Sequence, residues 1–265
     1  MANTKSFPTT TSFLARECIV APVDRQRRKN THWIVDKNQL HIDIDDMLTE
    51  KDIDLLEWLF AYGNPTEVRE GIGFKFSLYA AAKALGQGRT RIRKRIERRQ
   101  KTLVTIRDGV WEAKGQVFGP SLRNLENGEY LVSITTGFAK LWNHGMLIYY
   151  DRFLDDILPI ASPIVRRLVR RALSHDFKPS YKLSLDNFLN EIRFAVDATQ
   201  ESKRKMRKAA IDDILAASEY LQCVFGIEVL VLRGGQPGIQ YTRDKNDDRL
   251  FIKTADEPTA LSNAA

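Results

Sequence analysis

One order of local patterns occurs twice in this sequence of 265 residues, and few folds accommodate it. In the first stretch the order is a helix, a strand, a short helix, a tight turn, a second helix and a hairpin. Ser77 and Thr90 are N-cap residues for the two later helices, and Gly86 ends the first of these. We expect these elements after Thr49 and at residues 73–76, 78–85, 91–100 and 103–113.

The second stretch repeats this order closer to the C-terminus. Ser162-Pro163 is a strong helix start, and Ser184 is placed to cap the next helix. Asp197 with Gln200 resembles a capping box for a long helix. We expect a basic amphipathic helix after Ser162, a strand at 181–183, helices at 185–194 and 198–222, and strands at 227–232 and 239–241.

A strand, two helices joined by a glycine-containing turn and a closing hairpin are the order of a winged helix-turn-helix. The sequence therefore predicts an α+β fold with tandem winged-helix domains. We expect the first domain at residues 32–143 and the second at 144–243. A flexible N-terminus, 1–31, and a flexible tail, 244–265, would flank them. A short helix at 137–142 is also expected.

Charge is distributed unevenly along the chain. Lys plus Arg number 41 and Asp plus Glu 34, a net charge of +7 with a pI near 9.3. Eight acids lie at residues 36–57, whereas cations cluster at 89–101, 166–171 and 203–208. Clustered cations in a chain of otherwise globular composition, 43% hydrophobic, favour a polyanionic partner.

The second helix of each repeat carries a basic cluster, which is where a recognition helix carries its DNA contacts. Ile92 and Ile96 should face inward, leaving the cations to reach double-stranded DNA. The predicted DNA-binding residues are Arg89, Arg91, Arg93, Arg95, Arg98, Arg99, Lys203, Arg204, Lys205, Arg207 and Lys208. The arginines on the helix after Ser162 are expected to contact the DNA backbone: Arg166, Arg167, Arg170 and Arg171. For Arg166 and Arg170 a role as interdomain charges is the alternative.

No catalytic or metal-binding pattern is evident, and we expect neither an enzyme nor a cofactor. The four histidines form no HxH or HExxH pair, and no P-loop is present. Tyr149 and Tyr150 are the residues that a DNA-nicking enzyme would use, but no metal motif accompanies them, and Leu147 and Ile148 favour a core position for Tyr149. Two cysteines without metal spacing and no membrane-length apolar run indicate a soluble, cytoplasmic protein.

The segments FKFSLYAAAKALG, TLVTI and IASPIVRRLVRRALSHDFKPSYKLSLDNFL resemble the TrfA-like plasmid replication initiators. The likeness runs from about residue 32 to 243. It implies two winged-helix domains that bind origin repeats, called iterons, and promote opening of the duplex. It also implies host replication initiator and helicase as partners, and a switch between homodimer and monomer. The Gln-Leu-x-Leu-Phe clamp-binding motif of some members is absent from this sequence.

Three alternatives stay open at this stage. A transcriptional repressor could use the same winged-helix fold. A nicking enzyme would use Tyr149 or Tyr150. An interaction module would bind acidic protein through its basic helices.

Overall fold

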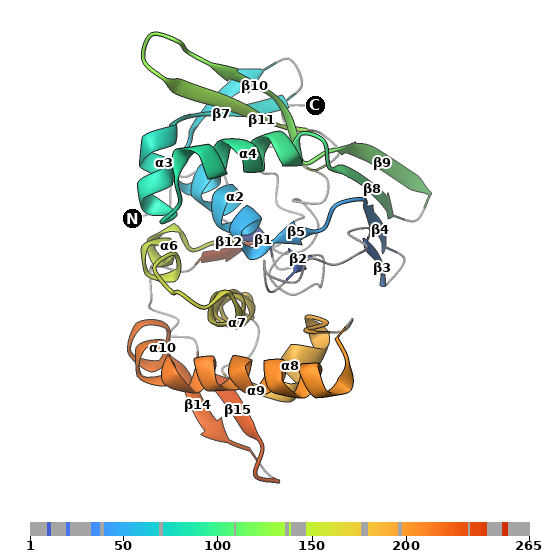
Figure 1. The fold of residues 1–265 in the computed structure, drawn as a ribbon, viewed down its shortest axis with the longest axis vertical. Helices are drawn as coiled ribbons and strands as arrows, with labels where there is room; N and C mark the ends of the chain where they lie inside the picture. Colours follow the sequence, from blue (N-terminus) through green and yellow to red (C-terminus); the bar gives the residue numbers. More distant parts are fainter. Residues whose placement is uncertain are drawn as a thin grey trace.

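The computed structural model mixes helices with small sheets (Figure 1). It describes residues 10–11, 20–21, 33–37, 40–68, 71–108, 110–135, 138, 147–175, 180–195, 198–232, 234–242 and 251–253. The expected α+β class is therefore confirmed. The predicted helix at 137–142 lies outside the described residues, apart from Phe138.

The first repeat has the predicted elements in the predicted order, with an unpredicted strand, β6, between the first helix and the predicted strand. Its elements are α2 (Glu50–Tyr62), β6 (Asn64–Val68), β7 (Gly71–Ser77), α3 (Leu78–Ala84), α4 (Arg89–Arg99), β8 (Leu103–Asp108), β9 (Trp111–Gln116), β10 (Phe118–Arg123) and β11 (Glu129–Thr135). The Thr49 backbone N–H donates to the Asp52 carboxylate at 2.7 Å, which confirms a cap at Thr49. Gly86 ends α3 with a left-handed φ of +59°.

Two antiparallel sheets flank the helices of this repeat. One has the strand order β10–β11–β7–β6. The other is β3–β4–β8–β9, with β3 at Trp33–Lys37 and β4 at Leu40–Ile44. The β8–β9 hairpin therefore joins strands that precede α2 in the chain, instead of the strand that leads into α3.

The second repeat is built from α7 (Pro163–Leu173), β13 (Tyr181–Ser184), α8 (Leu185–Glu191), α9 (Gln200–Ala216), α10 (Ser218–Phe225), β14 (Ile227–Val231) and β15 (Pro237–Tyr241). Its three strands form one antiparallel sheet in the order β13–β15–β14. Before it come β12 (Leu147–Tyr149) and α6 (Asp151–Ile157). The Ser184 hydroxyl accepts a bond from the Asn187 N–H, as predicted for a cap.

Four predicted helix boundaries were wrong. Gly88, which has no side chain, is the N-cap of α4 in place of Thr90. The N-cap of α9 is Thr199, whose side chain accepts from the Ser202 N–H. The single helix expected at 198–222 is interrupted at Ala217, and α8 stops at Glu191 because Arg193 and Ala195 adopt positive φ.

Parts of both expected flexible ends are paired in sheets. The strand β1 (Thr10–Thr11) and the strand β16 (Phe251–Lys253) flank β12 in one antiparallel sheet. The strand β2 (Val20–Ala21) pairs in parallel with β5 (Leu48–Thr49). Backbone pairing of this kind satisfies peptide groups on both partners, so these short segments are held at the sheets.

Helix α2 is an element of the first repeat that contacts α7 of the second. The buried apolar residues form one continuous cluster that extends from Ile42 to Tyr241. In Figure 1, α7 is seen almost end-on between α2 above and α9 below. Glu50, Asp54 and Glu57 fall on one side of α2 by helical spacing and face α7, whereas Asp52 falls on the other side and faces α4.

Candidate nucleic-acid interface

Helix α4 is positioned by an apolar stripe on its inner face. Ile92 and Ile96 are buried, as their four-residue spacing predicts. The turn from α3 is closed by a backbone bond from the Gln87 N–H to the Ala82 carbonyl at 3.0 Å. The remaining faces of α4 are therefore held toward solvent by a short, fixed connection.

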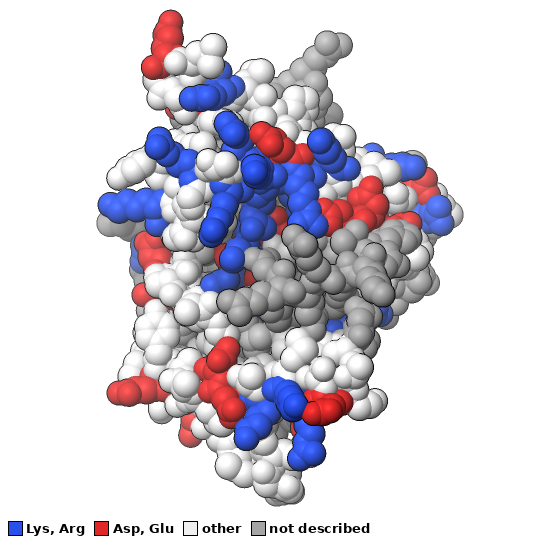
Figure 2. Space-filling view, in the orientation of Figure 1, with Lys and Arg blue, Asp and Glu red and all other residues white. Residues whose placement is uncertain are grey.

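Four cations of α4 lie exposed on this outer surface: Arg89, Arg91, Arg93 and Lys94. Figure 2 shows blue side chains gathered over the α4 region of the molecule. Among the described residues the only ion pair of these four joins Arg93 to Glu97 at 3.6 Å, and both side chains are about half exposed. Such a pair contributes about 0–1 kcal/mol and leaves the guanidinium available to a stronger anion.

Three other arginines of α4 are bound to acids of the protein itself. Arg99 is 1% exposed and bonds Asp52 at 2.7 Å, while Arg95, at 18%, bonds the other oxygen of that carboxylate at 2.9 Å. Arg98, at 53%, pairs with Asp46. The prediction that all three face DNA is wrong for Arg99 and Arg95, because Asp52 holds them against the start of α2.

The charge on Asp52 is part of this arrangement. Burial alone would raise the pKa of the Asp52 carboxyl, but the guanidinium groups of Arg99 and Arg95 and their hydrogen bonds hold it well below its usual range. Asp52 is therefore ionised at any physiological pH. Arg95 and Arg99 therefore position α4 against α2. The exposed cations on the outer face of α4 carry the charge that a ligand can reach.

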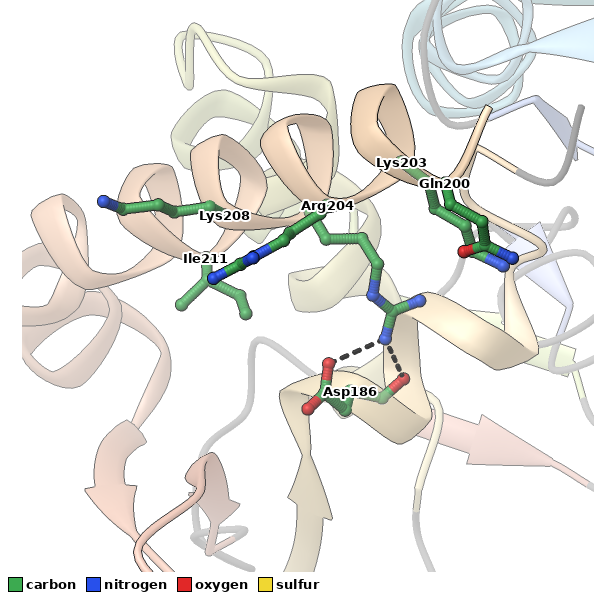
Figure 3. A pocket seen from close by; sticks show the side chains of 7 residues that line it. Asp186, Gln200, Lys203, Arg204, Lys208 and Ile211 are labelled. Carbon is green, nitrogen blue, oxygen red and sulfur yellow. Dashed lines mark hydrogen bonds and ion pairs between the residues drawn. The ribbon is translucent and has the colours of Figure 1, made fainter. Parts of the chain in front are cut away.

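Helix α9 carries the second basic cluster. Arg204, Lys205 and Lys208 are exposed and Lys203 is half-buried, whereas Arg207 is held by Asp186 of α8 at 2.7 Å and by Asn190 at 2.9 Å. Figure 3 shows a hollow of about 480 Å³ that Lys203, Arg204, Arg207 and Lys208 line, with dashed lines at Asp186. Arg207 thus fixes α9 to α8, and Lys205 bonds Glu201 one turn earlier at 2.6 Å.

The arginines of α7 do not reach the surface as DNA contacts would require. Arg167 and Arg170 are 0% exposed and Arg166 is nearly buried. Arg170 bonds Glu50, Asp54 and Glu57 of α2 at 2.6, 2.7 and 2.7 Å. Arg166 lies 3.3 Å from Asp54, and Arg167 lies 3.6 Å from Glu50.

Three arginines thus face three acids across the α2–α7 contact. The expected backbone contacts are contradicted for these three, and the interdomain alternative fits the geometry. Arg171, the fourth, is 13% exposed and pairs with Glu191 at 2.6 Å.

The two tyrosines that a nicking enzyme would use are buried in the core. Tyr149 and Tyr150 are buried, and the Tyr150 hydroxyl donates to Glu57. Burial and the nearby Glu57 carboxylate raise the pKa of Tyr150 well above that of a free tyrosine, which disfavours a nucleophilic phenolate. Within the described ranges, no group of three or more His, Cys, Asp or Glu could hold a metal ion. No described helix is both long enough and apolar enough to span a bilayer.

Arg123 is part of the basic surface and was not identified in the sequence analysis. A hollow of about 340 Å³ between α4 and the β10–β11 hairpin is lined by Arg89 and Arg93 together with Arg123 of β10. Arg123 is a single cation before the turn-forming segment Asn124–Gly128, and no charge run marks it. Only the strand register brings it beside α4.

Comparison with known proteins identifies the fold. No family model matches the chain, and no curated protein matches it. A selenomethionine crystal structure of domains 2 and 3 of RctB matches 86% of this chain and 96% of its own, at 14% identity and a TM-score of 0.58. A second RctB structure gives a TM-score of 0.53, with 14% identity and 86% and 95% coverage. The chain shares the fold of these two domains.

A crystal structure of the Pi initiator protein in complex with iteron DNA is more distant. It is 13% identical, with a TM-score of 0.40, over 74% of this chain and 90% of that one.

Proposed function

We propose that this protein binds double-stranded DNA sequence-specifically, at repeated sites in a replication origin, and acts there as an initiator. The observation that carries the proposal is the outer face of α4, where Arg89, Arg91, Arg93 and Lys94 are exposed while Ile92 and Ile96 anchor the helix. Arginine can bond guanine through two donors, and lysine neutralises phosphates. The resemblance of the sequence to TrfA-like plasmid initiators supports the origin as the target.

Two winged-helix domains, at 32–143 and 144–243, are part of the proposal. In the first, the short helix α3 and the basic helix α4 are followed by the hairpin β8–β9; in the second, α8 and the basic helix α9 are followed by α10 and then the hairpin β14–β15. On duplex DNA the two basic helices would enter major grooves about one helical turn, ~34–36 Å, apart. Host replication initiator and helicase would then be recruited to the opened origin.

Salt dependence of duplex binding tests the DNA-binding step. If about 6–10 phosphates are contacted, affinity should fall roughly 10³–10⁵-fold between about 50 and 200 mM salt. Fluorescence anisotropy with duplexes selected from random sequence measures both this slope and the specificity. A flat salt response, or equal affinity for selected and random duplexes, contradicts the proposal.

A transcriptional repressor would bind DNA through the same surface and would differ from an initiator only in the effect of binding. Maintenance of a plasmid whose origin contains the selected repeats separates the two roles. Replication that depends on the protein supports an initiator, whereas binding that only lowers transcription of a neighbouring gene supports a repressor. Nicking loses support from the burial of Tyr149 and Tyr150, and relaxation of supercoiled DNA with divalent metal is its direct test.

A further inference from the structure

The hollow lies where the two helices of the proposed helix-turn-helix, α3 and α4, meet the β10–β11 hairpin. We infer that it binds one backbone phosphate of the DNA, which Arg123 grips together with Arg89 and Arg93. The inference rests on the proposed function and extends it, because it gives the hairpin a role in DNA binding. It also predicts a contact that carries no sequence information.

Strand register places Arg123 on the helix side of the sheet. Arg123 lies directly opposite Tyr130 of β11, and Tyr130 lies opposite Phe76 of β7. Opposed residues of neighbouring antiparallel strands point to the same face. Tyr130 and Phe76 are buried, with ring centroids 6.0 Å apart, so Arg123 projects toward the face that α3 and α4 cover.

The turn that closes the hairpin holds this arrangement in place. The Asn124 side-chain oxygen accepts from the N–H groups of Glu126 and Asn127, at 2.9 and 3.3 Å. Gly128 completes the turn with a φ of +71°, which favours glycine. Asn127 and Gly128 then line the hollow beside Arg123. These bonds fix the backbone at the end of the hairpin, which forms one side of the hollow.

The lining of the hollow is positive and contains no acid. Besides its three arginines, its residues are neutral: Ser77, Leu78, Tyr79, Thr90, Asn127, Gly128 and Tyr130. Among the described residues, no carboxylate lies within ion-pair distance of Arg89 or Arg123, and Arg93 has only its half-exposed pair with Glu97. The hollow at α9 differs, since Asp186 is one of its walls and already binds Arg207. Three guanidinium groups that line one hollow, of which only Arg93 has an ion pair among the described residues, favour a phosphate, which offers several acceptor oxygens.

The neighbourhood of the hollow favours a phosphate of the duplex over a free anion. Arg91 and Lys94 of the same helix are also exposed, and Figure 2 shows cations gathered over this part of the molecule. A DNA strand that follows α4 would cross the hollow. Inorganic phosphate shares the chemistry, so the experiment includes it as a separate arm.

The variant Arg123→Ala tests the inference by anisotropy on the full chain with selected and random duplexes. We expect affinity to fall about tenfold for both duplexes, because one charge-assisted contact is lost. The slope of log K against log salt should become shallower by about 0.9. Arg123→Lys should keep the slope and recover part of the affinity. Leu125→Ala, at the tip of the same hairpin, and Lys182→Ala, which removes one charge elsewhere, should leave both values unchanged.

Two results would overturn the inference while leaving the proposed function intact. One is a parent protein that binds duplex DNA with normal salt dependence and an Arg123→Ala variant with the same affinity and slope. The other is a saturable site for inorganic phosphate, measured by calorimetry, that Arg123→Ala abolishes without any change in duplex affinity. A parent protein that binds no duplex would instead overturn the proposed function itself.

Discussion

Arg170 of α7 and Glu57 of α2 form a two-point ion pair that is fully buried. The Arg170 Nε and Nη2 atoms lie 2.9 and 2.7 Å from one Glu57 oxygen, and both side chains are 0% exposed. Glu50 and Asp54 accept the other donors of the same guanidinium. Burial raises the pKa of Glu57 and of Glu50, and Arg170 opposes that rise. The contact between the two repeats thus depends on one central cation.

Replacing Arg170 by Met should destabilise the protein by about 3–5 kcal/mol, because three buried acids lose their shared partner. Urea unfolding followed by circular dichroism measures the loss. The control is Lys205→Ala, which removes a 76% exposed partner of Glu201 and should change stability by less than about 0.5 kcal/mol. A loss below about 1 kcal/mol for Arg170→Met would show that the network contributes little.

The double variant Arg170→Met/Glu57→Leu should be more stable than Arg170→Met alone by about 1–3 kcal/mol. It removes one charge of each sign, which leaves Arg166 and Arg167 facing Glu50 and Asp54, and contacting residues couple by amounts of this size. The same unfolding assay gives the coupling. Additive losses would mean that the two residues act independently.

Asp52→Asn should destabilise the protein at neutral pH but not in strong acid. The folded-state pKa of Asp52 is depressed, so its contribution is present above the unfolded value of about 3.9 and is lost as pH falls below it. The difference in unfolding free energy between parent and variant should therefore shrink progressively below about pH 4. Thermal melts across pH 2–7 measure it, and a constant difference contradicts the low pKa.

Charge reversal on α4 should separate binding residues from positioning residues. Arg91→Glu is expected to weaken duplex binding at least tenfold while changing stability by less than about 0.5 kcal/mol, because the side chain is exposed. Arg95→Glu would place a carboxylate beside Asp52 and should lower stability by about 2–4 kcal/mol. Anisotropy measures the duplex affinity of both variants, and thermal melts measure their stability. Equal melting temperatures for Arg91→Glu and Arg95→Glu would mean that Arg95 is a surface residue.

Truncation of the predicted core residues should be costly in both repeats. Ile92→Ala and Leu168→Ala each remove a side chain that is 0% exposed, and each should lose about 2–4 kcal/mol. Exposed Leu125→Ala, at 85%, is the matched control and should be close to neutral. Near-neutral unfolding of either core variant would mean that its site relaxes to fill the space.

The order of elements was predictable because periodicity and caps are local signals. Ile92 and Ile96 identified the inner face of α4. The same spacing also predicts the burial of Arg99, which was not recognised in the sequence analysis. Arg99 lies three residues after Ile96 and seven after Ile92, so helical spacing places it on the buried face. The burial of Arg99 follows from the pattern if a buried arginine that pairs with an acid, here Asp52, is accepted on the inner face.

The role of the α7 arginines was not predictable from their own segment. IVRRLVRR has an apolar side, and its basic side looks solvated until α2 is packed against it. The acids Glu50, Asp54 and Glu57 share one face of α2 by spacing, but nothing local says which cations meet them. Which elements lie together is a tertiary property, and the same holds for Arg123, whose position depends on strand register.

The two basic helices are linked through a series of packed contacts that passes through α2. Helix α4 is held to α2 by Asp52, α2 to α7 by Arg170, and α7 to α9 by packing and by the bond from Ser162 to Asp213 at 2.8 Å. In the proposed complex with DNA, the protein would therefore set the relative rotation of the two basic helices about the duplex. A DNA site lengthened by half a helical turn between its two contacted segments would present the second segment on the opposite face. The phase of the repeats, as much as their sequence, then becomes a determinant of recognition.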